Sequence, residues 1–268
     1  MASVSAVTPV PATFRAAVWA EFVRAARPPF EIPLVVLCNG LLVVAFWFSR
    51  FSAVMFHVHG SLAFPIVLGS WMYADVPATN VLGSDHHRAL AALDDPPRLM
   101  RLLAARSALL WLMVAPGCVL IAVIIGIVDG RVFAAMWTVI AIAIVPLGAL
   151  AVSDWVGIVW PYVPVSLRSR WRDRRHVRVQ VRWLVLICAP YVVVPAVLGV
   201  VLLPALGWWE IKTHGVVGRI SDGLLAQLTI IACVTSLAVW WAGRAGSRRL
   251  IRRYRDRLRV SLSAPDPD

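Results

Sequence analysis

The sequence predicts an all-α protein that crosses a membrane with six helices and has both termini in the cytoplasm. Three observations lead to this fold class: the composition, six apolar stretches, and the distribution of basic residues between them. Of the 268 residues, 60% are hydrophobic and 15% are charged, and the mean hydropathy is +0.78. A soluble domain has about half apolar and about 25% charged residues. One buried core does not account for this excess, so we expect membrane crossings.

Six stretches have the apolar character of membrane-spanning helices, which need about 20 mostly apolar residues each. They cover residues 32–48, 61–83, 108–128, 132–155, 183–206 and 224–242. The chain is thus divided into a cytoplasmic arm over 1–30, a transmembrane domain over 31–243 and a basic cytoplasmic tail over 244–268. The arm lacks the apolar region of a secretory signal, so we expect the first span itself to direct the chain to the membrane.

The basic residues set the predicted orientation. Twenty-two of the 26 Lys and Arg residues lie in the arm, the second and fourth connections and the tail, which alternate with connections that hold only four. Short connections rich in Lys and Arg stay in the cytoplasm. The net charge of +12 therefore signals orientation and contact with anionic lipids of the inner leaflet, and we expect no nucleic-acid partner.

The arm contains an expected amphipathic helix between residues 13 and 27. Thr13 is a suitable N-cap, and apolar residues then recur every four positions, with Trp19 beside them. An apolar stripe with Trp and Arg fits a helix that lies in the inner membrane interface. The alternative is an ordinary amphipathic helix that packs on the protein. The recurring residues are Phe14, Val18, Phe22 and Ala26.

The second connection, residues 80–106, predicts a short helix between two spans. Asp85 favours the positive N-terminal end of this helix, and Ala89, Leu90 and Leu93 supply a small apolar face. The prolines at 96 and 97 are expected to end it. A short helix with apolar side chains and charged flanks is suited to docking into a cleft on a cytoplasmic partner.

This connection resembles the segment between the second and third spans of type-2 ABC transporter permeases, the membrane subunits of exporters. The family's acidic–basic–Gly pattern is replaced here by Asp85-His-His-Arg88-Ala89, with Ala in place of Gly. The end of the fourth span, residues 148–164, is similar to that of some actinobacterial members, with Asp154 where Asn or Ser is commoner. The residues that match the order of the family's segment are Asn80, Asp85, Arg88, Ala89, Leu90, Leu93, Pro97 and Arg106.

The resemblance implies a permease subunit in a bacterial plasma membrane that works by alternating access. It implies a separate ATP-binding cassette ATPase, which holds ATP and Mg²⁺, and a second permease chain in a homo- or heterodimer. Leu90 and Leu93 would contact the ATPase, Asp85 and Arg88 would set the polar register, and residues 85–97 would form the coupling segment. The chain has no P-loop motif, so we expect it to bind no nucleotide or other cofactor itself.

Polar residues within the spans are candidate sites. Asp75, Asn80 and Asp154 lie toward the cytoplasmic ends of the second and fourth spans. Such carboxylates are either interfacial or Arg-paired, or they contact a substrate or relay protons. The fourth connection is very basic and suits anionic lipid, although a subunit contact or a topology signal alone would explain it equally. Its candidate lipid-contacting residues are Arg168, Arg170, Arg172, Arg174 and Arg175.

Two other classes of function stay open. An integral membrane enzyme that acts on a lipid or lipid-linked substrate would use Asp75 or Asp154. The sequence, however, has no HExxH, GxSxG or zinc-ligand motif and no clustered carboxylates in one membrane-facing loop, Asp94-Asp95 being the nearest to such a cluster. We therefore expect neither catalytic nor metal-binding residues. A membrane scaffold or immunity protein would need no nucleotide-binding partner at all.

Overall fold

The computed structural model describes residues 10–27, 30–49, 60–161, 177–213 and 221–263, and within these ranges it contains helices and no strand. The all-α prediction is confirmed for them. In chain order the elements are α1 (Phe14–Ala25), α2 (Glu31–Trp47), α4 (Ala63–Tyr73), α5 (Val76–Thr79), η1 (Gly83–Asp85), α6 (His86–Ala92), α7 (Pro96–Val128), α8 (Val132–Val159), α10 (Val177–Thr213) and α11 (Asp222–Ser263).

Four helices are long and apolar enough to cross a membrane, which supports a membrane protein. They are α7, α8, the Cys188–Thr213 part of α10, and α11. Two shorter apolar helices, α2 and α4, lie where the first and second spans were predicted. Large apolar side chains on the outer surfaces of these helices are exposed, as helices surrounded by lipid require.

The predicted span over 61–83 is wrong as a single helix. α4 ends at Tyr73, and Asp75 has an extended backbone with φ of −134°. The Asp75 carboxylate accepts a hydrogen bond from the N–H of Val76 at 2.6 Å, so it caps a new helix instead of continuing the old one. The helix therefore breaks in the middle of this apolar stretch, and the four-residue helix α5 follows α4.

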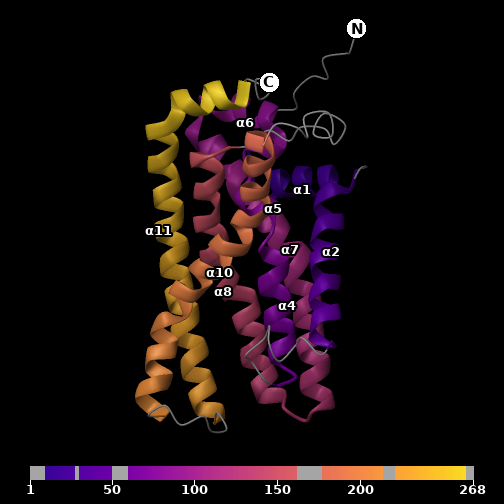
Figure 1. Cartoon of the computed structure of the whole chain (residues 1–268). Coiled ribbons are helices and arrows are strands. Elements are labelled where there is room, and N and C mark those ends of the chain that lie inside the picture. Colours follow the sequence, from indigo (N-terminus) through magenta and orange to yellow (C-terminus); the bar gives the residue numbers. More distant parts are fainter. Residues whose placement is uncertain (1–9, 28–29, 50–59, 162–176, 214–220, 264–268) are drawn as a thin grey trace.

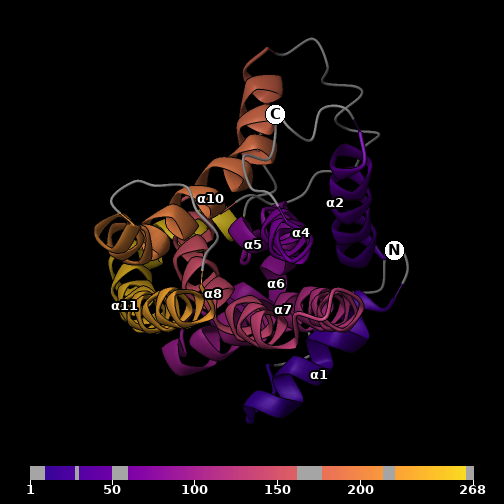
Figure 2. The same cartoon turned by 90° about the horizontal axis from the view of Figure 1, so that it is seen from below.

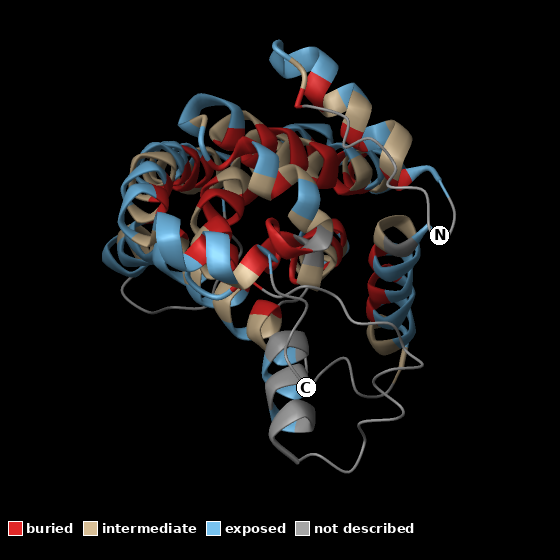
Figure 3. Ribbon diagram, turned by 90° about the horizontal axis from the view of Figure 1, so that it is seen from above, coloured by how far each residue is buried: buried red, intermediate tan, exposed pale blue. Residues whose placement is uncertain are grey.

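The helix α8 lies at the centre of the bundle and packs against α7, α10 and α11 (Figure 1). Seen along the bundle, α2 and α4 lie on one side of α7, and α1 crosses its outer side (Figure 2). Buried residues are concentrated where α7, α8 and α11 meet, whereas the outer faces are exposed (Figure 3). The helices α1 and α6 and the C-terminal part of α11 lie together at one end of the bundle (Figure 1).

Small residues allow α8 and α11 to approach closely. A Cβ on Gly148 would lie 2.8 Å from the backbone oxygen of Ser236, and a Cβ on Gly243 would lie 3.0 Å from the Cβ of Ala151. The Ser236 hydroxyl accepts a hydrogen bond from the Gly148 N–H at 3.1 Å. The Trp155 indole donates to the Gly243 carbonyl at 2.9 Å. Close backbone contact and hydrogen bonds between helices replace the hydrophobic driving force that lipid does not supply.

The helix α11 continues without a break from the sixth predicted span into the basic tail. Residue 244, where the tail was expected to begin, lies inside it. Beyond this point α11 turns across the end of the bundle toward α6 (Figure 1). Ile251, Leu258 and Leu262 are each 1% exposed and belong to the apolar cluster that also contains α6 residues. The first part of the tail is therefore a packed element of the fold.

Replacing Gly148 with Ala tests the close contact between α8 and α11. The added methyl group meets backbone atoms that cannot move aside, so we expect a loss of about 1–3 kcal/mol in the free energy of unfolding. Gly199→Ala in α10 is the matched control, because nothing lies within 4 Å of its Cβ position and Ala favours a helix over Gly. Thermal unfolding of the detergent-purified protein measures the stability of both variants. Equal melting temperatures for the two variants would contradict the packing described.

Candidate functional site

Three aspartates at ten-residue intervals each precede a helix in or next to the second connection. Asp75 caps α5, Asp85 caps α6 and Asp95 caps α7. The carboxylates of Asp85 and Asp95 accept hydrogen bonds from the N–H groups three residues later, at 3.3 and 3.2 Å. Pro96 is the first residue of α7, a position where its missing N–H costs nothing. Pro96 and Pro97 were expected only to end the short helix, but they also form the first turn of α7.

The apolar face of α6 points into the protein. Ala89, Ala92 and Leu93 are at most 2% exposed, and they pack in one cluster with Ile251 and Leu258 of α11. In this structure α11 covers the side chains of Ala89 and Leu93, so of the two leucines predicted to contact a partner Leu93 is buried and Leu90 is half-buried. The sequence could not show this, since the covering residues lie more than 150 positions away.

A different face of α6 is open. His87, Ala91 and Asp94 are exposed, at the spacing of one side of a helix, while Leu90 is half-buried. Arg255 of α11 binds the Asp94 carboxylate at 2.5 Å, and Arg259 binds the same oxygen. The hydrogen bond from Arg255 and the charges of both arginines hold the pKa of Asp94 below its usual value. Any partner that contacts α6 in this arrangement meets the surface around His87 and Ala91.

Beside α6 lies a buried network of five charged side chains that joins three helices. Glu21 of α1 is 1% exposed, and its Oε1 atom accepts a hydrogen bond from Arg88 Nη1 of α6 at 2.8 Å. Its Oε2 atom accepts from Arg24 Nη2 at 2.7 Å and from Arg106 Nε of α7 at 3.2 Å. Asp85 Oδ2 lies 3.6 Å from Arg106 Nη2 and 3.7 Å from Arg88 Nε. Three guanidinium groups thus share two carboxylates.

Glu21 is ionised within this network. Burial by itself raises the pKa of a carboxyl group, but the guanidinium of Arg106, followed by those of Arg24 and Arg88, more than offsets this effect and holds the pKa of Glu21 below its usual value. An ionised Glu21 is also what the arginines need, because without it their charges would face one another out of water. We designate Glu21, Arg24, Asp85, Arg88 and Arg106 the α1–α6–α7 charge network.

The sequence reasoning missed Glu21. It identified the aromatic stripe of the arm, and the structure confirms the helix and its Thr13 cap. The stripe, however, points outward: Trp19 is 66% exposed and Phe22 is 44% exposed. The buried face is Ala17–Glu21–Ala25. An acidic residue between two alanines at four-residue spacing was the available signal, because small residues allow close approach and a lone carboxylate there needs a cationic partner.

The intramembrane candidate Asp75 is bonded to neutral groups. Asn39 Nδ2 of α2 donates to Asp75 Oδ2 at 3.0 Å, and the Tyr191 hydroxyl of α10 donates to Asn39 Oδ1 at 2.7 Å. Among the residues that the structure describes, no arginine forms an ion pair with Asp75. The chain Asp75–Asn39–Tyr191 ties α2, the break after α4 and α10 together.

The other two candidate residues, Asp154 and Asn80, lie where α8 meets its neighbours. Arg244 Nη1 of α11 lies 2.8 Å from Asp154 Oδ2, so Asp154 has the Arg partner that one of the two sequence readings proposed. Asn80 is buried at the end of α5. There the backbone passes so close to α8 that a Cβ on Gly157 would lie 2.8 Å from the Thr79 oxygen. The Arg244 partner thus accounts for Asp154 without a substrate, and Asn80 lies where the backbone after α5 meets α8.

The remaining candidates are the five arginines of the fourth connection. Arg168, Arg170, Arg172, Arg174 and Arg175 lie beyond the described residues. Among the described residues, no group of three or more His, Cys, Asp or Glu side chains is placed to hold a metal ion. Comparison of the chain with protein-family models, curated proteins and solved structures found no match.

Neutralising Glu21 tests the charge network. In Glu21→Gln the three guanidinium groups lose their shared counter-charge, so we expect a loss of about 3–5 kcal/mol in the free energy of unfolding. Asp256→Asn is the control, because Asp256 is exposed on α11 and we expect a change within about 0.5 kcal/mol. Thermal unfolding in detergent, followed by size-exclusion chromatography, gives both values. A Glu21→Gln variant as stable as the control would rule out the network as a structural element.

The lowered pKa of Glu21 also predicts how this effect depends on pH. A carboxyl group with a folded pKa below its ordinary value of 4.5 stabilises the fold above that value, and the contribution is lost as the pH falls through the folded pKa. The difference in melting temperature between the wild type and Glu21→Gln should therefore be constant from about pH 8 to pH 5 and should shrink at lower pH. A difference that is unchanged or larger in acid would contradict an ionised Glu21.

Proposed function

We propose that this chain is the permease subunit of an ATP-driven exporter, similar to type-2 ABC transporter permeases, and that a separate ATPase contacts α6. The observation that carries the proposal is the position of α6. This short helix lies at one end of an apolar bundle and is fixed by charge to α7, a helix of 33 residues. At 1.5 Å per residue α7 is about 50 Å long, so a displacement of α6 would be transmitted across the whole bilayer.

In the proposed topology α2, α4, α7, α8, α10 and α11 are the six spans, and α1 and α6 lie on the cytoplasmic side. The distribution of arginine supports this orientation. The end of the bundle that carries α6 also carries Arg88, Arg98, Arg101 and Arg106 and the Arg-rich part of α11. The exposed aromatic residues of α1, among them Trp19, then lie at the level of the lipid headgroups of a bacterial plasma membrane.

The burial of Leu93 changes the proposed contact with the ATPase. The partner would meet the exposed side of α6, with His87 and Ala91, and the charged residues Asp85 and Arg88 would act behind it by tying α6 to α1 and α7. ATP and Mg²⁺ would be bound by the partner. A second permease chain would complete the pathway, and α2 offers it an apolar surface, because Leu34, Leu37 and Leu41 are each more than half exposed.

A lipid-modifying enzyme is less well supported. It would need at least one intramembrane carboxylate free to contact a substrate. Asp75 is bonded to Asn39, and Asp154 is paired with Arg244 and is 1% exposed. No observation favours a scaffold or immunity protein over a permease, and the experiment below distinguishes these classes.

Cross-linking from α6 tests the proposal. In a chain whose four native cysteines are replaced by alanine, His87→Cys and Ala91→Cys would each carry a thiol-reactive photo-cross-linker in membranes of the native host. We expect a product that contains a P-loop ATPase, identified by mass spectrometry, with a yield that changes when ATP and Mg²⁺ are added.

Val132→Cys is the matched control, because Val132 is 64% exposed and begins α8 at the opposite end of the bundle. It should give no ATPase product. A product with another class of protein from positions 87 and 91, or no product at all, would contradict the permease proposal.

A further inference from the structure

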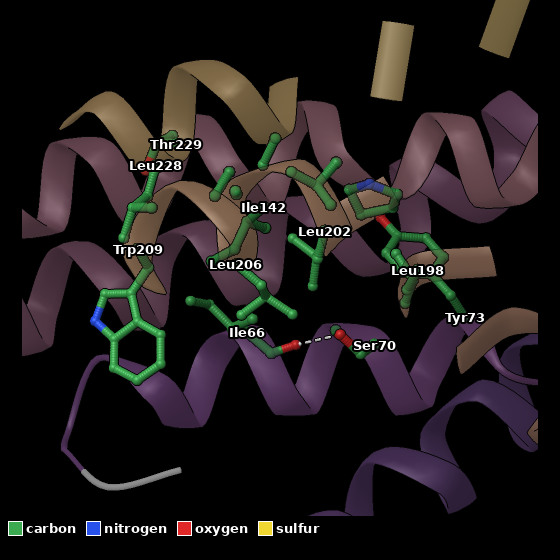
Figure 4. A pocket seen from close by; sticks show the side chains of 16 residues that line it. Ile66, Ser70, Tyr73, Ile142, Leu198, Leu202, Leu206, Trp209, Leu228 and Thr229 are labelled. Carbon is green, nitrogen blue, oxygen red and sulfur yellow. Dashed lines mark hydrogen bonds between the residues drawn. The ribbon is translucent and has the colours of Figure 1, made fainter. Parts of the chain in front are cut away.

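A cavity of about 470 Å³ lies between α4, α8, α10 and α11 (Figure 4). Ligand pockets have volumes of about 300–1,000 Å³, and an apolar cavity of only about 150 Å³ already binds benzene. The walls are almost wholly hydrocarbon, and none of the described residues that line the cavity has a charged side chain. Its size and apolar character suit a hydrophobic ligand and exclude an ionic one, because an unpaired charge here would be very costly.

The cavity is elongated along the bundle. α10 lines it with five residues at the spacing of one helix face, from Leu198 to Trp209. Eleven residues of helix correspond to about 16 Å. Figure 4 shows Tyr73 beside Leu198 at one end and Trp209 near Leu228 and Thr229 at the other. A single hydrocarbon chain has this shape, whereas a compact ring system would leave one end empty.

The cavity opens toward the surrounding lipid. Ile66 of α4 and Leu206 of α10 line it from two sides and are 42% and 54% exposed. Figure 4 shows these two side chains facing one another across the cavity. A hydrophobic molecule dissolved in the bilayer could therefore enter between α4 and α10 without passing through water.

One end of the cavity holds a polar group that needs a partner. The Tyr73 side chain is 1% exposed, and its buried hydroxyl has no hydrogen-bond partner among the described residues. Figure 4 shows this hydroxyl pointing away from α4 toward the opposite wall. A hydroxyl that can donate or accept a hydrogen bond is thus available to one neutral oxygen-bearing group.

We propose that this cavity binds an uncharged, single-chain lipid that carries a neutral oxygen group, such as a long-chain or isoprenoid alcohol, with that group at Tyr73. The hydrocarbon chain lies along α10 toward Trp209. The site lies within one chain, so the inference goes beyond the transport proposal and does not depend on an ATPase partner.

Photolabelling in proteoliposomes tests the site. The probes are a long-chain alcohol with a mid-chain diazirine, the carboxylate of the same length, and a phospholipid with the same diazirine on one acyl chain. We expect the alcohol to label peptides from α4 and from the Leu198–Trp209 face of α10 more strongly than either other probe does. Equal labelling by the phospholipid would show that any bilayer chain fills the cavity and would overturn the proposed ligand class.

Substitutions at two neighbouring positions on α10 distinguish binding inside the cavity from contact with the lipid-facing surface. Leu202→Trp fills the cavity and should abolish labelling of its walls by the alcohol, whereas Leu203→Trp lies on the lipid side, where Leu203 is 61% exposed, and should leave labelling unchanged. Equal labelling in both variants would overturn the site.

Tyr73→Phe keeps the shape and removes only the hydroxyl. It should weaken binding of the alcohol by about two- to tenfold, the effect of one net hydrogen bond, without changing labelling by the phospholipid. This variant also keeps the proposal testable if Leu202→Trp does not fold. Unchanged binding of the alcohol to Tyr73→Phe would show that the neutral oxygen group is not recognised there.

Discussion

The carboxylate of Glu21 is a negative charge that three guanidinium groups share at a place with almost no access to water. The position of three helices depends on this arrangement. α1 has little apolar surface directed at the bundle, because its large aromatic residues point outward and its inner face is two alanines and Glu21. α6 has only seven residues, too few to be stable alone. Charge in a dry environment supplies the directed attraction that α1 lacks by hydrophobic packing, and it adds to the apolar packing of α6 against α11.

The second constraint is the close contact of α8 and α11, which brings the far end of the chain to α6. Glycines and serines let the two helices approach along their length, and the Asp154–Arg244 pair lies toward the α6 end of this contact. From there α11 turns and covers the apolar face of α6. The short helix is therefore held by charge on one side and by apolar packing on the other. In the permease proposal, this double attachment lets a movement of α6 reach α7 and α11 together.

Much of the helical fold could be predicted from the sequence, because the length of apolar runs follows from the thickness of the bilayer. The orientation that the arginine distribution indicates stays a prediction. The helix over 13–27, the helix after Asp85 and the long helices are where these signals place them. The break at Asp75 was not predictable from hydropathy, since a capping carboxylate is a local hydrogen-bonding choice within an apolar run. The burial of Leu93 and the arginine partners of Glu21 require contacts between distant parts of the chain. The alanines that flank Glu21 on its helix face indicate burial, but a single sequence does not show which partners it meets.

The coupling between Glu21 and Arg88 is the most direct test of the view that charge fixes α6 to α1 and α7. A double-mutant cycle with Glu21→Gln, Arg88→Met and the double variant, measured by unfolding in detergent, isolates this pair from the rest of the network. The account predicts a coupling energy of about 1–3 kcal/mol, with the double variant more stable than the sum of the single effects implies. Single effects that add within about 0.5 kcal/mol would contradict it.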